Sequence, residues 1–69
     1  MELTQKQKML AVALFTRRIR RENTAAILMV LKTDDEIDDL TWYMGQHPQA
    51  MDEELVAVAY QLAKEARGK

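Results

Sequence analysis

The chain has 69 residues and no cysteine, and this combination most limits what it can fold into. A single hydrophobic core in so short a chain contributes only about 3–5 kcal/mol. Disulfides and thiolate metal sites cannot supplement that core, and a lone histidine, His47, cannot form a zinc site. Dense helix packing and oligomerisation are the usual supplements that remain.

The composition favours helices along the whole chain. Only two glycines and one proline are present, whereas residues with high helix propensity are abundant. Hydrophobic residues make up 48% of the chain, which is too apolar for a disordered protein. We therefore expect one all-α domain over residues 1–69, folded as a compact orthogonal bundle of three to four short helices.

Two residue pairs have the spacing of a capping box, in which a threonine and a residue three positions later cap a helix start reciprocally. The pairs are Thr4 with Gln7 and Thr33 with Glu36. They predict helices that begin near residues 5 and 34. Between them, Asn23 or Thr24 can cap the apolar segment 25–32, which suits a short buried helix better than a buried strand.

The later helix boundaries depend on a glycine and a proline. Gly45 suits the left-handed turn beyond a helix end, and Pro48 suits the first turn of the next helix, although Asp52 could cap a later start. The expected helices span residues 5–21, 24–32, 34–44 and 49–67.

The first expected helix is apolar almost all round between residues 9 and 15. Helical spacing puts Val12, Phe15 and Ile19 on one face, which we assign to the core, and leaves a second apolar stripe. The last helix carries a similar second stripe. Such stripes predict a homodimer, and its candidate interface residues are Leu10, Leu14, Val56 and Tyr60.

The charges divide the chain into a basic and an acidic half. Residues 1–32 carry seven basic and two acidic side chains, and residues 33–69 carry three basic and nine acidic ones. The halves can pair with each other on the surface, where each pair contributes at most about 1 kcal/mol. Alternatively, one or both charged surfaces bind a partner, because complementary charge speeds and orients association.

Three arginines at the end of the first expected helix could contact phosphates: Arg17, Arg20 and Arg21 lie within about 100° of one another on a helical wheel. The competing interpretation is that they interact favourably with the negative end of the helix dipole. Acidic residues 52–54 argue against a helix-turn-helix around Gly45, because they would repel DNA phosphates.

Trp42 is the most informative single residue of the acidic half. The apolar positions of its expected helix lie on the opposite side, so Trp42 is expected either to contact a partner or to be covered by a neighbouring helix. The acidic run around it provides a surface for a basic partner. The candidate partner-binding residues are Trp42, Asp35, Asp38 and Asp39.

Catalytic groups are scarce. The chain has no serine, no cysteine and no glycine-rich phosphate loop, so we expect no enzymatic activity and no cofactor. Its longest apolar runs have seven residues, far short of the roughly 20 that span a membrane, and we expect a cytoplasmic protein. The leading interpretation is a protein–protein interaction or regulatory module acting as a homodimer, and the alternative is a nucleic-acid-binding regulator.

Overall fold

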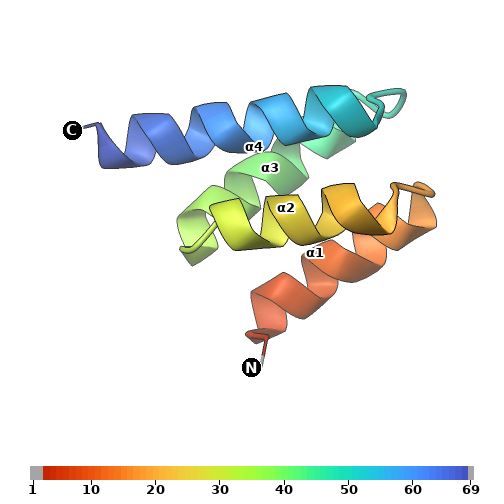
Figure 1. Cartoon of the computed structure of the whole chain (residues 1–69), viewed down its shortest axis with the longest axis horizontal. Coiled ribbons are helices and arrows are strands. Elements are labelled where there is room, and N and C mark those ends of the chain that lie inside the picture. The colour runs from red at the N-terminus through yellow and green to blue at the C-terminus, as the bar shows by residue number, and fades with distance from the viewer. Residues whose placement is uncertain (1–2, 69) are drawn as a thin grey trace.

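The computed structural model describes residues 3–68 and consists of four helices over that range (Figure 1). They are α1 (Gln5–Thr16), α2 (Arg21–Val30), α3 (Asp34–Gln46) and α4 (Asp52–Arg67). The predicted all-α bundle is confirmed, and residues 25–30 are helical, as favoured over a strand.

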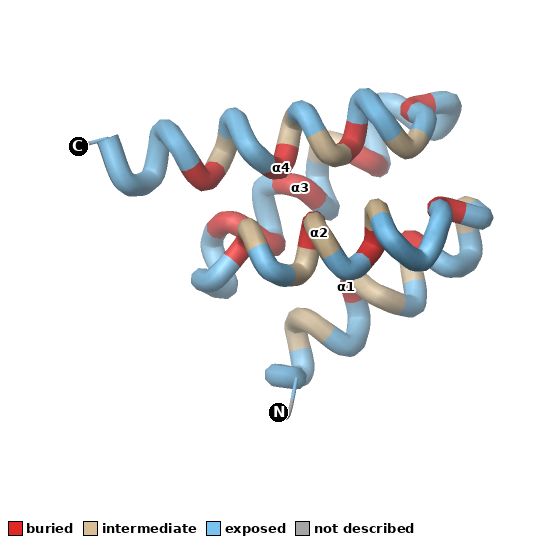
Figure 2. Tube along the Cα trace, viewed as in Figure 1, coloured by how far each residue is buried: buried red, intermediate tan, exposed pale blue. Residues whose placement is uncertain are grey.

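Helices α2 and α4 run side by side in the same direction, while α1 and α3 cross them (Figure 1). Helix α4 packs on α2 and α3, and α1 also packs on α2 and α3 but makes no contact with α4 over the described residues. The core lies between the helices, and buried positions face inward along each of them (Figure 2). Its largest fully buried side chains are Leu10, Leu14, Ile27, Leu31, Leu40 and Leu55.

Helix α1 ends at Thr16, so the prediction of a helix to residue 21 is wrong. The Arg18 N–H donates to the Phe15 carbonyl at 2.9 Å, and the Ile19 N–H donates to the Leu14 carbonyl at 3.0 Å. These two bonds form a Schellman motif, which ends a helix with one residue in the left-handed conformation. That residue is Arg18, with φ of 63°, where glycine is the usual choice. Burial of Ile19 against the core stabilises the turn.

Helix α2 begins at Arg21, earlier than predicted, and neither Asn23 nor Thr24 caps it. Its first residues are held by α4 instead. The Asp52 Oδ2 atom accepts a hydrogen bond from the Arg20 backbone N–H at 2.7 Å and another from the Asn23 side chain at 2.9 Å. The Arg20 bond and then the Asn23 bond lower the pKa of Asp52 below its usual value.

The other end of α2 is also held by α4. The Arg67 Nη2 atom donates to the Val30 carbonyl at 2.9 Å, and no basic residue lies in the last turn of α2 itself. A carboxylate thus lies at the positive end of the α2 dipole and a guanidinium at its negative end, which is the favourable arrangement. The two ends of α4 clamp the two ends of α2.

Helix α3 begins with the predicted Thr33–Glu36 capping box, and α1 begins with the predicted Thr4–Gln7 box. Gly45 does not end α3, because it lies inside the helix without a positive φ, and α3 continues to Gln46. Helix α4 starts at Asp52, not at 49, so Pro48 belongs to the connecting turn.

The Schellman turn can be tested by Arg18→Gly. Glycine occupies the left-handed region without the steric cost that arginine pays there, so this variant should be about 0.5–1 kcal/mol more stable than the parent, as measured by urea unfolding followed by circular dichroism. If residues 17–21 continued a helix, glycine would instead destabilise the protein by about 1 kcal/mol. The sign of the change separates the two arrangements.

The Asp52 clamp predicts a specific pH dependence. A carboxyl whose pKa is lowered by folding stabilises the protein above its unfolded pKa, about 3.9, and this contribution is lost as the pH falls through the folded pKa. Asp52→Asn can accept the same bonds but does not titrate. The parent should therefore exceed Asp52→Asn in unfolding free energy near neutral pH, and the difference should shrink on acidification. A difference that is independent of pH would contradict the clamp.

Candidate functional site

Trp42 lies on the side of α3 that faces away from the core and is 66% exposed. The inward side of the same helix holds Ile37, Leu40 and Met44, all of which are buried. Neighbouring helices therefore leave the indole largely uncovered, which answers the question that the sequence left open. A large aromatic side chain exposed in this way provides an anchor for contact with another molecule.

The three candidate aspartates surround Trp42 on the same side of the helix. Asp38 and Asp39 precede it by four and three residues, and Asp35 lies one further turn away, so the spacing brings all four side chains onto adjacent positions. All three aspartates are exposed. We call Asp35, Asp38, Asp39 and Trp42 the outer face of α3.

The outer face of α3 meets α1 at Asp38. The Lys6 ammonium lies 2.7 Å from the Asp38 carboxylate, and both side chains are about half exposed. The hydrogen bond to Asp38 and its charge raise the pKa of Lys6. Within residues 3–68, this is the only ion pair between the basic N-terminal segment and the acidic run. Asp35 and Asp39 make no ion pair within that range.

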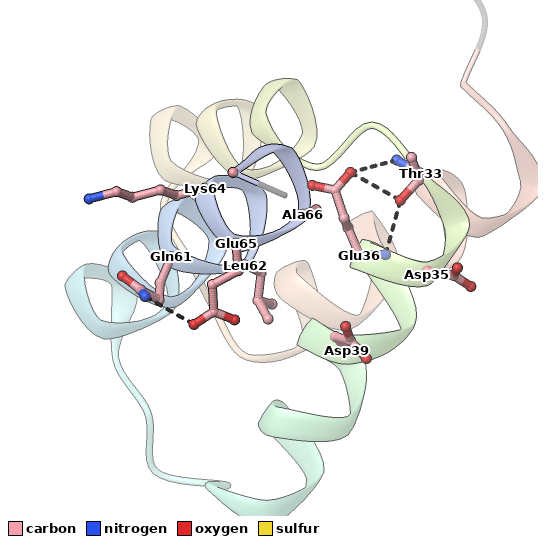
Figure 3. A pocket seen from close by; sticks show the side chains of 10 residues that line it. Thr33, Asp35, Glu36, Asp39, Gln61, Leu62, Lys64, Glu65 and Ala66 are labelled. Atoms are coloured by element: carbon pink, nitrogen blue, oxygen red, sulfur yellow. Dashed lines mark hydrogen bonds between the residues drawn. The ribbon is translucent and has the colours of Figure 1, made fainter.

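On its other side, the outer face of α3 borders a groove of about 620 Å³ between the start of α3 and the end of α4 (Figure 3). Asp35 and Asp39 line it from α3, and Glu65 lines it from α4, where its Oε1 atom accepts a hydrogen bond from Gln61 at 3.0 Å. Leu62 adds apolar surface. Lys64 also lines the groove, but its side chain points away from Asp35 and Asp39 (Figure 3), so the carboxylates extend the acidic surface from α3 toward α4.

Glu36 also borders this groove, but its carboxylate is buried. One oxygen accepts hydrogen bonds from the Thr33 N–H at 3.2 Å and the Thr33 hydroxyl at 3.0 Å (Figure 3). The other oxygen has no hydrogen bond among the described residues and lies 3.7 Å from Arg67. Glu36 therefore joins the start of α3 to the end of α4. The capping-box spacing indicated that Glu36 caps the start of α3. Nothing in the local sequence indicated its proximity to Arg67 at the end of α4.

Tyr43 and His47 lie close together at the C-terminal end of α3, next to its outer face. The Tyr43 hydroxyl donates a hydrogen bond to the Glu54 carboxylate of α4, which raises the pKa of the phenol. The rings of Tyr43 and His47 stack with centroids 4.2 Å apart. This contact gives His47 a packing role at the end of α3.

The arginines of the proposed phosphate surface do not form the helical face that the sequence predicted, because α1 ends before them. The Arg17 guanidinium donates to the carbonyls of Met44 and His47, the latter at 3.1 Å, and so holds the end of α3. Arg20 borders a pocket with Asp52 and Glu53. Arg21 is exposed in the first turn of α2.

The four candidate dimer residues do not form one surface. Leu10 and Leu14 are buried in the core, so their assignment to an exposed interface is wrong. Val56 is partly buried against the core, whereas Tyr60 is exposed. The two sides of α1 are reversed relative to the prediction, because Val12 and Phe15, which we assigned to the core, are exposed.

Among residues 3–68, no group of three or more histidine, aspartate or glutamate side chains is arranged to hold a metal ion. Within the same range, no helix is both long and apolar enough to cross a membrane. Comparisons with protein-family models, curated proteins and solved structures find no match to this chain.

The structural role of Arg17 at the end of α3 can be tested by Arg17→Ala. Because Arg17 donates charged hydrogen bonds to two carbonyls at the end of α3, its removal should lower the unfolding free energy by about 1–3 kcal/mol. Arg21→Ala is the matched control and should change stability by less than about 0.5 kcal/mol, since Arg21 is exposed. Equal small effects of both variants would remove the structural role of Arg17.

Proposed function

We propose that this protein is a non-catalytic protein-binding module that takes a basic partner on the outer face of α3 and acts as a homodimer. The observation that carries the proposal is the 66% exposure of Trp42 opposite the core of α3. Tryptophan is enriched among the few residues that dominate the energy of protein interfaces. A regulatory or adaptor role follows from binding without chemistry.

The charge of α3 supports a basic partner. The helix carries five acidic residues and no basic one, and of the aspartates on its outer face only Asp38 forms an ion pair within residues 3–68, with Lys6. A partner arginine could stack on the indole of Trp42 and bond to Asp39, because a guanidinium combines cation–π contact with carboxylate recognition. Such a complex weakens as ionic strength rises.

The acidic groove beside the outer face of α3 supports the same partner chemistry. Asp35, Asp39 and Glu65 line this groove together with the apolar side chains of Leu62 and Ala66, and Lys64 is the basic residue in its lining. The aliphatic stem of a lysine or arginine could contact that apolar surface while its charged end meets the carboxylates. We further propose a cytoplasmic setting, supported by the absence of cysteine from so small a domain.

Nucleic-acid binding through the basic residues is the less favoured alternative. It needs a cationic surface at the α1–α2 turn, but the Arg17 guanidinium is bonded to carbonyls of α3, and Arg20 lies beside Asp52 and Glu53. The remaining arginines, Arg18 and Arg21, provide few phosphate contacts, and affinity for phosphates depends on the number of such contacts.

The proposal predicts the effect of Trp42→Ala. Because the indole is exposed, the unfolding free energy should change by less than about 0.5 kcal/mol. Binding of the physiological partner should weaken by about thirtyfold or more, the effect expected for a residue that dominates an interface. The partner is obtained by affinity capture from the native cell after nuclease treatment, and its affinity is then measured with the purified components.

Tyr60→Ala is the matched control, because Tyr60 is an exposed aromatic residue on α4 outside the outer face of α3. It should leave the affinity unchanged, whereas Asp39→Asn should reduce it and weaken its dependence on salt. Equal capture by the parent and Trp42→Ala would exclude this surface. Captured proteins that disappear after nuclease treatment, together with oligonucleotide binding by the purified protein at low salt, would favour the nucleic-acid alternative.

A further inference from the structure

Helix α1 presents apolar side chains on both of its sides. Leu10 and Leu14 face the core and are buried, while Met9, Val12 and Phe15 face away from it and are 61%, 64% and 56% exposed. We call Met9, Val12 and Phe15 the apolar face of α1. At about 100° per residue, Val12 points almost opposite to Leu10 and Leu14. A helix that is apolar all round is normally covered on all sides.

The bundle covers only one side of α1. Within the described residues α1 packs on α2 and α3 but not on α4, and half of its twelve residues are exposed (Figure 2). We infer that a second copy of this chain covers the apolar face of α1, with the two α1 helices packed antiparallel about Val12. This inference rests on the homodimer of the proposed function and names the surface that forms it.

The spacing of the apolar face is self-complementary. When two α1 helices pack antiparallel with Val12 at the two-fold axis, Met9 of one copy lies opposite Phe15 of the other, and the same pair repeats on the far side of the axis. A methionine sulfur against an aromatic ring is a favourable contact. A foreign partner would need a matching sequence, whereas a second copy provides it by symmetry.

Lys8 is the charged residue of α1 that lies beside the apolar face, next to Met9 and Val12, and its position favours the antiparallel arrangement. The first turn of α1 contains no acidic residue and its last turn no basic one, whereas the first turns of α2, α3 and α4 all contain acidic residues. Lys8 thus lies toward the end of α1 where its own helix dipole disfavours a cation. In the antiparallel pair, Lys8 lies opposite Thr16 of the second copy, next to the negative end of that helix. Lys6 comes opposite Arg18 of the second copy in this register, and its charge is offset within its own chain by the 2.7 Å ion pair with Asp38.

The size of the domain also favours a second copy. A 69-residue chain without disulfides has a small core, and oligomerisation is a common way to enlarge it. Pairing through α1 buries apolar side chains that the single chain exposes. The apolar face of α1 adjoins the outer face of α3, because Met9 and Asp38 line one pocket, but Trp42 does not line it. Self-association and partner binding therefore use adjoining surfaces with different central residues, Val12 and Trp42.

The absence of native cysteine allows a direct test, because Val12→Cys places a single thiol at the proposed axis. Under oxidised glutathione at micromolar protein concentration, this variant should form a disulfide-linked dimer readily, since two cysteines at the axis approach within the distance that a disulfide needs. Met29→Cys is the matched control. It is 75% exposed on α2, away from the proposed interface, and should cross-link far more slowly. Equal cross-linking rates would overturn the inference.

Sedimentation provides the second test. The parent should be a dimer, and Val12→Asp should raise the dimer dissociation constant by about tenfold or more, because two carboxylates would face each other at the axis. The exposure of Val12 in the single chain predicts unchanged helicity, measured by circular dichroism. Met29→Asp should remain dimeric. A monomeric parent, or a Val12→Asp variant that stays as dimeric as the parent, would overturn the inference.

The emission of Trp42, the only tryptophan, separates failure of this inference from failure of the proposed function. Trp42 does not line the pocket in which α1 meets the outer face of α3, so pairing about Val12 should leave its emission unchanged on dilution from dimer to monomer. A shift on dilution would mean that copies associate through the outer face of α3, and would overturn the α1 interface. Loss of partner binding in Trp42→Ala with an intact dimer would leave both proposals standing.

Discussion

The fold depends on the way in which α4 holds both ends of α2. Helix α2 has ten residues and no side-chain cap of its own, and a helix this short has little stability in isolation. Asp52 binds its first residues, Arg67 donates to its last carbonyl, that of Val30, and the core packs between the two helices. The same Arg67 lies near the buried Glu36, so the start of α3 is tied to this pair as well. The connecting segments are short, and α1 and α3 then have to cross the α2–α4 pair.

The sequence predicted those features that neighbouring residues determine. Both capping boxes could be recognised because the two partners of each lie three positions apart, and Trp42 could be assigned to the outward side because the rest of α3 has one clear apolar side. The end of α1 could not be predicted, because Arg18 occupies a conformation that glycine usually marks. The start of α2 depends on Asp52, a residue 32 positions after Arg20, and no local pattern reports such a contact.

The two sides of α1 were exchanged for a different physical reason. A helical wheel identifies the buried side by contrast with a polar side, and between residues 9 and 15 this helix offers no contrast. Leucine stripes at 10 and 14 and the stripe through Val12 satisfy the same periodicity. Tertiary packing buries the stripe with Leu10 and Leu14. The exposed stripe through Val12 is the one that we infer to be covered by a second copy. A helix with apolar residues on both sides gives an ambiguous helical wheel, and for the same reason it leaves one apolar side available for an interface.

The division into a basic and an acidic half does not produce a general neutralisation of the surface. Within residues 3–68 only two ion pairs form, and most of the engaged charges bind helix ends: Arg17 at the end of α3, Asp52 and Arg67 at the ends of α2. Each of these helix ends is bound by one charged side chain, so few of the acidic residues on α3 are engaged in this way. Asp35 and Asp39 therefore keep their charge beside an exposed tryptophan. Asp35 and Asp39 can meet a basic partner without breaking an ion pair within residues 3–68, whereas Asp38 is already paired with Lys6.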